Sequence, residues 1–196
     1  MHNFYDSKFK KQVISIGPGE YYTTNQDVII QTVLGSCVAV CLFTEADDFC
    51  GMNHFMLPGD VSKNNIEDCD AGRYGMYSME ILINSLLKKG VDKKLIKAKV
   101  FGGGNVIDFK TAMKSRVGDN NVTFILAFLE EEKIPIVSNH LGGDNARKIL
   151  FFQEDKRVLL KKINKTEAFN TVKEEIEYNK SIVSETTKKS NIILFD

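Results

Sequence analysis

Hydrophobic positions in the first third of the chain alternate or run without interruption, as they do in β-strands rather than in helices. The strands that this pattern predicts are residues 11–16, 28–43 and 49–57. Gly17-Pro18-Gly19 ends the first strand, and Pro58-Gly59 closes the third. Gly35-Ser36 interrupts the second, so we expect two strands, or one bulged strand, around that turn. The polar residues 60–70 are expected to form a loop.

Three later stretches carry apolar residues at spacings of three and four, which is typical of amphipathic helices. We predict helices over residues 73–89, from about residue 120 onward, and from Thr166 to about Glu185. Asp119 or Asn120 is the expected N-cap of the second helix. The residues expected to face the core are Met76, Met79, Leu82, Ile83, Leu86 and Leu87 in the first helix, Val122, Ile125, Leu126 and Leu129 in the second, and Phe169, Val172, Ile176 and Val183 in the third.

Further strands are predicted at residues 97–101, from residue 134, and in a hairpin of residues 148–152 and 157–162. Gly102-Gly103-Gly104 follows the first of these but lacks the GxxxxGK[ST] pattern of a phosphate loop. We therefore expect a strand-end turn there, in which two backbones approach closely. Strands outnumber helices, and helices lie between groups of strands, so the pattern favours a layered α/β or α+β fold.

Composition excludes several classes of function. The chain has 196 residues, of which 43% are hydrophobic, and this suffices for the core of one domain, or of one domain with an appendage. Lys plus Arg and Asp plus Glu both number 26, so no basic surplus points to nucleic acid. No stretch approaches the roughly 18 apolar residues of a membrane span. We expect a cytoplasmic protein without membrane insertion, whose four cysteines are free thiols.

Cys37 and His54 are the strongest candidates for chemistry. A thiol attacks as the thiolate, and at its ordinary pKa of about 8.5 it needs a base such as imidazole. Cys37 directly follows Gly35-Ser36, where a glycine permits a backbone that exposes the thiol at a strand tip and leaves N–H groups free for an oxyanion hole. The pair indicates a Cys-His hydrolase, although a free cysteine is also often a buried core residue.

Other residues offer alternatives. A zinc site would use Cys37, Cys41 and His54, but the sequence has neither a CxxC knuckle nor an obvious fourth ligand. Cys41 is flanked by apolar residues and is better explained as part of the core. His140 is a weaker candidate for the base. Arg147 either pairs with a carboxylate near the site or holds the hairpin.

Six spaced blocks of sequence resemble the CheD family, the chemoreceptor glutamine deamidases of bacterial chemotaxis. The blocks occur in the family's order and span roughly residues 12–163, which makes the resemblance specific. They are Thr32 to Phe43 around Gly-Ser-Cys, Met52 to Pro58 around His54, Gly72-Arg73-Tyr74, Lys99-Val100-Phe101-Gly102-Gly103-Gly104, Val117-Gly118, and Leu141-Gly142-Gly143 followed by Arg147.

The resemblance implies hydrolysis of glutamine side chains to glutamate on methyl-accepting chemotaxis receptors. It implies an α+β fold of the layered α/β/β type, in which two packed β-sheets carry helices on the outside, similar to the catalytic domains of deamidating toxins. This domain would cover residues 1–164, followed by a helical extension over residues 165–196. No cofactor or metal is implied. The implied partners are the chemoreceptors and a CheC-type phosphatase that competes with them for the same surface.

The resemblance also assigns roles to residues. Cys37 matches the nucleophile and His54 the base, and backbone donors at Gly35 and Ser36 are expected to stabilise the oxyanion. A threonine assists the pair. Some relatives place it six residues before the cysteine, where this chain has Gln31, whereas Thr32 lies five residues before. On a regular strand five positions reverse the facing, so Thr32 orients His54 only if a bulge at Gly35 restores it.

Two other functions remain open at this point. The chain is alternatively a regulatory binding module that engages receptors and a CheC-type phosphatase, with catalysis secondary. A cysteine peptidase or a transglutaminase-like enzyme is the third possibility. The C-terminal helix either caps the sheet or reaches a partner.

Overall fold

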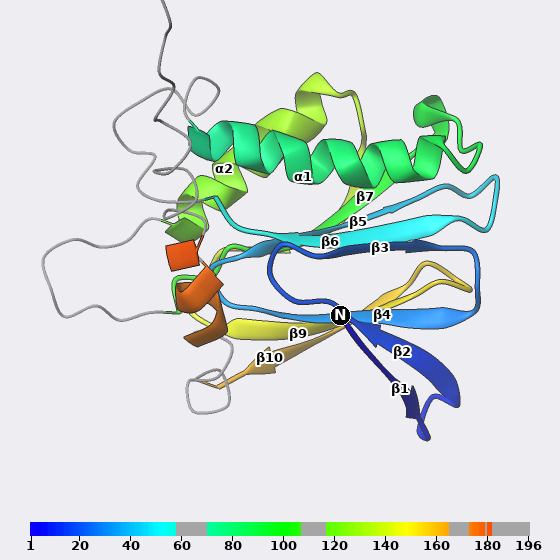
Figure 1. The fold of residues 1–196 in the computed structure, drawn as a ribbon, viewed down its shortest axis with the longest axis horizontal. Coiled ribbons are helices and arrows are strands. Elements are labelled where there is room, and N and C mark those ends of the chain that lie inside the picture. The colour runs from blue at the N-terminus through cyan, green and yellow to red at the C-terminus, as the bar shows by residue number, and fades with distance from the viewer. Residues whose placement is uncertain (58–69, 107–116, 165–172, 179, 182–196) are drawn as a thin grey trace, which may run out of the picture.

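Two β-sheets pack face to face, and helices cover one of them (Figure 1). The computed structural model describes residues 1–57, 70–106, 117–164, 173–178 and 180–181. The outer sheet has the strand order β1-β2-β4-β9-β10, and the central sheet, which lies between the outer sheet and the helices, has the order β3-β6-β5-β7-β8. The expected α+β fold with two packed sheets is confirmed.

All the strands expected from the sequence are present. The outer sheet contains β1 (His2–Asp6), β2 (Lys11–Ser15), β4 (Val28–Leu34), β9 (Ala146–Phe152) and β10 (Val158–Ile163), and the central sheet contains β3 (Tyr21–Thr24), β5 (Val38–Phe43), β6 (Cys50–Phe55), β7 (Lys97–Gly102) and β8 (Ile136–Leu141). Neighbouring strands are antiparallel except for two parallel pairs, β2 with β4 and β7 with β8. The sequence pattern does not predict β1 and β3, because both lie at sheet edges, where β1 has no buried residue and β3 has one.

Strand β5 shows how the layers share the core. All six of its residues are buried, because the strand has a packed layer on each face. Alternate side chains belong to different clusters, as the two-residue period of a strand requires. Val38, Val40 and Leu42 pack with the helices, whereas Ala39, Cys41 and Phe43 pack between the two sheets. Cys41 is thus a core residue, as predicted.

Two helices lie against the central sheet, α1 (Asp70–Leu87) and α2 (Val117–Glu131). Helix α2 starts before residue 119, so Asp119 and Asn120 lie within it and the prediction of either as N-cap is wrong. Leu126 is 40% exposed, and its predicted inward facing is also wrong. The buried stripe follows Asn121, Ile125 and Leu129, and residue 126 lies one helical step beyond it. None of the described helices combines the length and hydropathy of a membrane span.

The C-terminal helix is described at residues 173–178 and 180–181, and is drawn in orange in Figure 1. Its Ile176 is partly buried, in agreement with the predicted apolar side. Asp70, the last residue of the predicted loop, is instead the first residue of α1. Other predicted features lie outside the described residues: the rest of that loop at residues 60–69, the cap at Thr166, and the inward facing of Phe169, Val172 and Val183.

Arg147 resolves one of the alternatives left open above, since it holds the turn between β8 and β9. Its guanidinium donates to the carbonyl oxygens of His140 at 2.5 Å, Asn145 at 3.1 Å and Gly142, and its Nη1 also lies 2.9 Å from His140 Nδ1. The side chain is buried, and no carboxylate is among the partners found for it in the described part of the chain. Arg147 therefore anchors the backbone, and its contact with His140 commits that imidazole to the same turn.

Candidate active site

The chain crosses from the outer sheet to the central sheet between β4 and β5, and residues 35–37 form the crossing. Each of their three carbonyl oxygens accepts a hydrogen bond from a residue outside the crossing. Gly35 O accepts from Gly104 N at 2.8 Å, Ser36 O from Asn121 Nδ2 at 2.8 Å, and Cys37 O from Gly103 N at 2.7 Å. With the carbonyls fixed, the N–H groups of residues 35–37 converge on one carboxylate, and we call these three N–H groups the anion hole.

Close backbone contact with the residue 102–104 turn makes this arrangement possible. Gly102 has φ +118°, and a Cβ there would lie 2.1 Å from Cys37 O. A larger residue would therefore push the crossing away from the turn. The expected strand-end turn with a close backbone approach is confirmed, and the residue whose backbone it contacts is Cys37, the candidate nucleophile.

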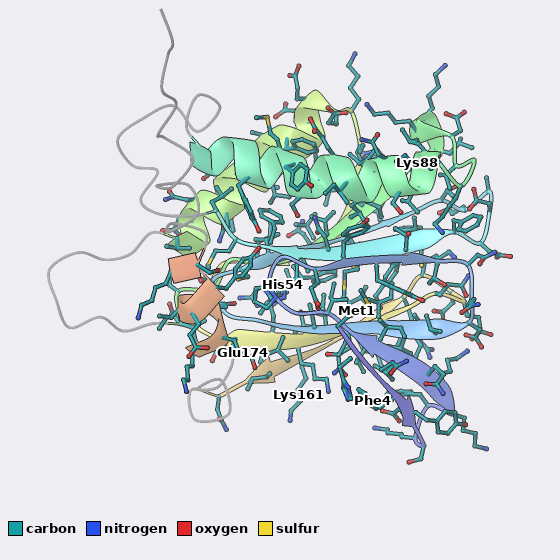
Figure 2. All side chains as sticks on the ribbon, viewed as in Figure 1. Met1, Phe4, His54, Lys88, Lys161 and Glu174 are labelled. Atoms are coloured by element: carbon teal, nitrogen blue, oxygen red, sulfur yellow. The ribbon has the colours of Figure 1, made fainter. Side chains whose placement is uncertain are left out.

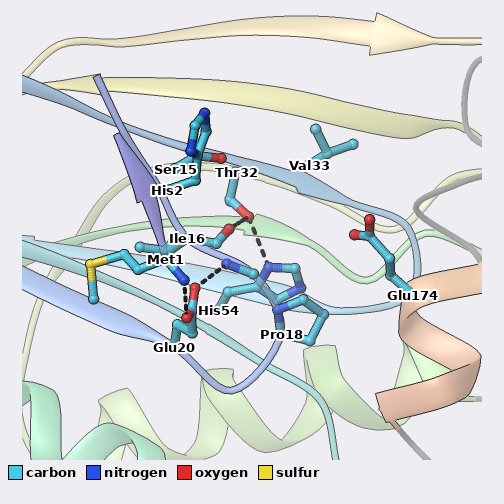
Figure 3. A pocket seen from close by; sticks show the side chains of 11 residues that line it. Met1, His2, Ser15, Ile16, Pro18, Glu20, Thr32, Val33, His54 and Glu174 are labelled. Carbon is cyan, nitrogen blue, oxygen red and sulfur yellow. Dashed lines mark hydrogen bonds and ion pairs between the residues drawn. The ribbon is translucent and has the colours of Figure 1, made fainter. Parts of the chain in front are cut away.

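His54 lies on β6, opposite Ala39 of β5 and thus close to Cys37. Its backbone N–H donates to Glu20 O at 2.9 Å, and its carbonyl accepts from Gly19 N at 2.8 Å. Its ring Nδ1 lies 2.8 Å from the hydroxyl oxygen of Thr32, as Figure 3 shows. That hydroxyl donates to Ile16 O at 2.8 Å, so its oxygen accepts from Nδ1–H. This assignment leaves the lone pair of His54 on Nε2.

Thr32 reaches His54 without the bulge that the facing argument requires. It shares one face of β4 with Ile30 and Leu34, and this face packs against the central sheet. The alternation of facing holds only along one continuous strand, but β4 ends at Leu34 and Cys37 lies in the crossing to another sheet. Gln31 points the other way, and its Nε2 lies 3.4 Å from Ser15 Oγ.

Three chemically active side chains meet at the crossing. The Sγ of Cys37, a ring nitrogen of His54 and a carboxylate oxygen of Glu175 all lie within 4.8 Å of one another. Among the described residues His54 Nε2 has no hydrogen-bond partner, so its lone pair is available to accept a proton. The zinc alternative named Cys41, which is not in this group; Glu175, from the C-terminal helix, takes its place.

Cys37 is fully buried, so the expectation of a thiol exposed at a strand tip is wrong for this state of the molecule. The C-terminal helix contacts the crossing through Glu175. Glu175 accepts hydrogen bonds from the N–H groups of Gly35 at 2.7 Å, Ser36 at 2.9 Å and Cys37 at 3.3 Å. Its carboxylate therefore fills the anion hole beside the sulfur.

Burial governs the charges of the pair. It raises the pKa of the Cys37 thiol well above its ordinary value, and the negative charge of Glu175 raises that pKa further. Burial lowers the pKa of His54 to about 4, although Glu175 acts in the opposite direction. At neutral pH the thiol and the imidazole are therefore both uncharged, and no thiolate–imidazolium pair forms in this state.

The lowered pKa of His54 predicts a stability that falls in mild acid. Between pH of about 6.5, where an unfolded histidine titrates, and the folded value of about 4, the unfolded chain binds the extra proton. The contribution is complete above pH 6.5 and is lost as the pH falls through that window. Urea denaturation at pH 7 and pH 5 should show a smaller loss for His54→Gln than for wild type. The exposed His2→Gln is the matched control, and an unchanged loss in His54→Gln contradicts this role of burial.

A pocket of about 500 Å³ opens next to the pair (Figure 3). Its lining includes Thr32 and His54 from the two sheets, Glu20 from the turn before β3, and Glu174 from the C-terminal helix. Figure 2 shows His54 between the two sheets, with Glu174 at the end of the molecule where the C-terminal helix lies. The pocket thus leads to the imidazole side of the site, while Glu175 occupies the thiol side.

Two residues of the site escape prediction from the sequence. Asn121 donates to Ser36 O and accepts from Leu57 N at 2.8 Å, so it fixes the crossing from helix α2. The only local signal is a polar residue on an apolar helix face. Glu175 lies in a helix whose other acidic and basic residues are exposed in the part that the structure describes, and nothing in its sequence position separates it from its neighbours Glu174 and Glu177.

Comparison with known proteins places the chain in a family. The family model described as CheD chemotactic sensory transduction matches residues 56–162, a range that begins just after His54. A probable chemoreceptor glutamine deamidase CheD of Methylobacillus flagellatus is 42% identical over 180 residues, covering 91% of this chain and 88% of that protein. The probable chemoreceptor glutamine deamidase CheD 2 of Chromobacterium violaceum is 41% identical over 196 residues, covering 99% of this chain and 95% of that protein. This chain therefore belongs to the CheD family.

Proposed function

We propose that the chain hydrolyses glutamine side chains on methyl-accepting chemotaxis receptors to glutamate, with release of ammonia. One observation carries the proposal. A thiol, an imidazole oriented by a hydroxyl, and an anion hole that holds a glutamate carboxylate meet within a few ångströms. A glutamate carboxylate is the product of this reaction. The names of the relatives support the substrate class, since they are called probable chemoreceptor glutamine deamidases.

In the proposed reaction His54 Nε2 takes the proton of Cys37, and the sulfur attacks the amide carbon of the substrate glutamine. Negative charge develops on the amide oxygen, where the N–H groups of Gly35, Ser36 and Cys37 stabilise it. His54 then returns the proton to the amide nitrogen, the C–N bond breaks, and ammonia leaves. The product of this half-reaction is a thioester on Cys37.

Water completes the cycle. His54 removes a proton from a water molecule, the hydroxide attacks the thioester carbon, and the C–S bond breaks to release glutamate and restore the thiol. Thr32 keeps the ring of His54 in the tautomer that both half-reactions use, because its oxygen accepts the Nδ1 proton. These steps require no metal or organic cofactor.

Mass spectrometry of a receptor fragment tests the function. Incubation with the protein should release ammonia and raise the fragment mass by about one dalton per converted glutamine, since an amide becomes an acid. Peptide mapping should place the change at glutamine side chains. Cleaved peptide bonds, or incorporation of an added amine in place of hydrolysis, would instead assign a peptidase or a transglutaminase-like activity.

A regulatory binding module is the second candidate, and the burial of Cys37 under Glu175 is the observation that favours it. In that case the chain binds receptors and a CheC-type phosphatase, and Cys37→Ala leaves adaptation unchanged.

We propose that residues 1–164 form the deamidase domain, that residues 165–196 form an extension, and that the chain acts in the cytoplasm. The free thiols of Cys37, Cys41 and Cys50 support a reducing compartment.

A further inference from the structure

The carboxylate of Glu175 is bound by the same donors that the proposed reaction assigns to the oxyanion. One oxygen accepts from Gly35 N at 2.7 Å and Cys37 N at 3.3 Å, and the other from Ser36 N at 2.9 Å and Ser36 Oγ at 2.8 Å. All four donors are neutral. Glu175 is only 2% exposed, and a charge buried to this degree needs such donors to offset the loss of water.

Gly35 leaves space for the carboxylate of Glu175. A Cβ on Gly35 would lie 2.8 Å from Glu175 Oε2, so a larger residue would displace the carboxylate from its position in the anion hole. The crossing therefore needs glycine here for the close approach of a ligand oxygen, and not for a left-handed backbone.

A second contact fixes the helix that carries Glu175. Tyr178, one helical turn further on, packs against the core cluster between the sheets and hydrogen-bonds through its hydroxyl to that of Tyr74 in α1. Gly19 has φ +79°, and a Cβ there would collide with the Tyr178 ring. Residues at positions i and i+3 share one face of a helix, so Glu175 and Tyr178 dock together.

The docked carboxylate also opposes the chemistry. It lies within 4.8 Å of Cys37 Sγ, where its negative charge disfavours the thiolate that the reaction needs. The same carboxylate occupies the position of a substrate amide. Both effects lower the deamidase activity of this state.

We propose that the C-terminal helix is a built-in product mimic, which presents Glu175 where a receptor helix presents its glutamine and keeps the active site closed until a receptor displaces it. This inference rests on the proposed deamidase function. It adds that the anion hole and its surroundings bind one face of a helix, with the reacting residue and an aromatic or other large side chain three positions later.

A glutamine at position 175 would lie where the proposed reaction takes place. In Glu175→Gln the amide oxygen can accept from Gly35 N and Cys37 N, but the amide NH₂ has no acceptor for Ser36 N–H. The glutamine therefore binds less firmly than the product carboxylate and lies at the thiol as a substrate. Cys37 displaces its nitrogen as ammonia, water then releases the acyl group, and the residue becomes glutamate.

Intact-mass and peptide-mass measurements on purified full-length Glu175→Gln test this step. We expect residue 175 to convert to glutamate with first-order kinetics that do not depend on protein concentration, as an intramolecular reaction requires. Glu175→Gln combined with Cys37→Ala should keep its glutamine. Glu177→Gln is the matched control, because it removes the same charge from an exposed position of the same helix and should also keep its glutamine.

Release of the helix is measured with Glu175→Ala and, independently, Tyr178→Ala. We expect each to speed receptor deamidation on the order of tenfold, a typical size for coupling within one protein. Alkylation of Cys37 by iodoacetamide, followed on its own peptide, should accelerate as well. If wild type deamidates the receptor, an unconverted glutamine in Glu175→Gln, or no acceleration in either alanine variant, overturns the product mimic but not the deamidase. Failure of wild type to deamidate any receptor glutamine overturns the proposed function.

Discussion

Cys37→Ala and His54→Ala should each lower kcat for receptor deamidation by about 10⁴-fold or more, and the double variant should lose little beyond either single one. The reason is that the thiol and the imidazole act as a unit, so removing one makes the other useless. His54 Nε2 has no hydrogen-bond partner among the described residues, and Cys37 Sγ lies within 4.8 Å of a ring nitrogen of His54. Rates are measured by the mass of the receptor fragment over time.

Cys41→Ala is the matched control for this experiment. Cys41 is fully buried on the same chain segment, but it packs between the sheets and is absent from the group formed by Cys37, His54 and Glu175. Its replacement should leave kcat within a few-fold of wild type, as the loss of one small core side chain does. Undiminished activity in Cys37→Ala would exclude it as nucleophile, and a multiplicative loss in the double variant would separate the roles of the two groups.

Thr32→Val should lower kcat by about 10²-fold with little change in KM, because a misaligned base costs rate more than substrate binding. Valine keeps the shape of threonine but removes the oxygen that accepts Nδ1–H and the hydroxyl that donates to Ile16 O. In the proposed mechanism Thr32 is a positioning residue, since it acts through His54. Thr32→Ser should restore most of the rate, and the pH profile of Thr32→Val should shift, because the tautomer and basicity of His54 change together.

Gln31→Ala distinguishes the two candidates for the third position. Gln31 points toward Ser15 on the other face of β4, so its loss should leave kcat unchanged. A large loss in Gln31→Ala together with normal activity in Thr32→Val would assign the third position to Gln31.

The sequence is a good guide where hydrophobic period alone determines structure. The strands around Gly35-Ser36 and the hairpin of β9 and β10 follow from composition and turn residues, because each strand has a buried or partly buried face. The first residue of α2 cannot be predicted from the hydrophobic period. Val117 and Gly118 precede the apolar stripe, and the close approach of Gly118 to Gly103 fixes the helix there through tertiary contact.

The candidate site divides in the same way. Cys37 and His54 can be proposed from residue type and spacing. The side of the sheet that Thr32 faces cannot, because side chains alternate between faces only along one strand, and the chain changes sheets between Leu34 and Val38. Glu175 is 138 positions from Cys37, and only the fold brings it to the anion hole. Its role depends on a long-range contact, which local sequence does not encode.

Interception by hydroxylamine tests the central claim, a thioester on Cys37, most directly. Hydroxylamine added during turnover competes with water for the acyl group, so receptor glutamines should become hydroxamates, each heavier than the amide by one oxygen atom. The yield should rise with hydroxylamine concentration and vanish in Cys37→Ala. Formation of glutamate alone at every hydroxylamine concentration, with the rate retained in Cys37→Ala, would contradict the account.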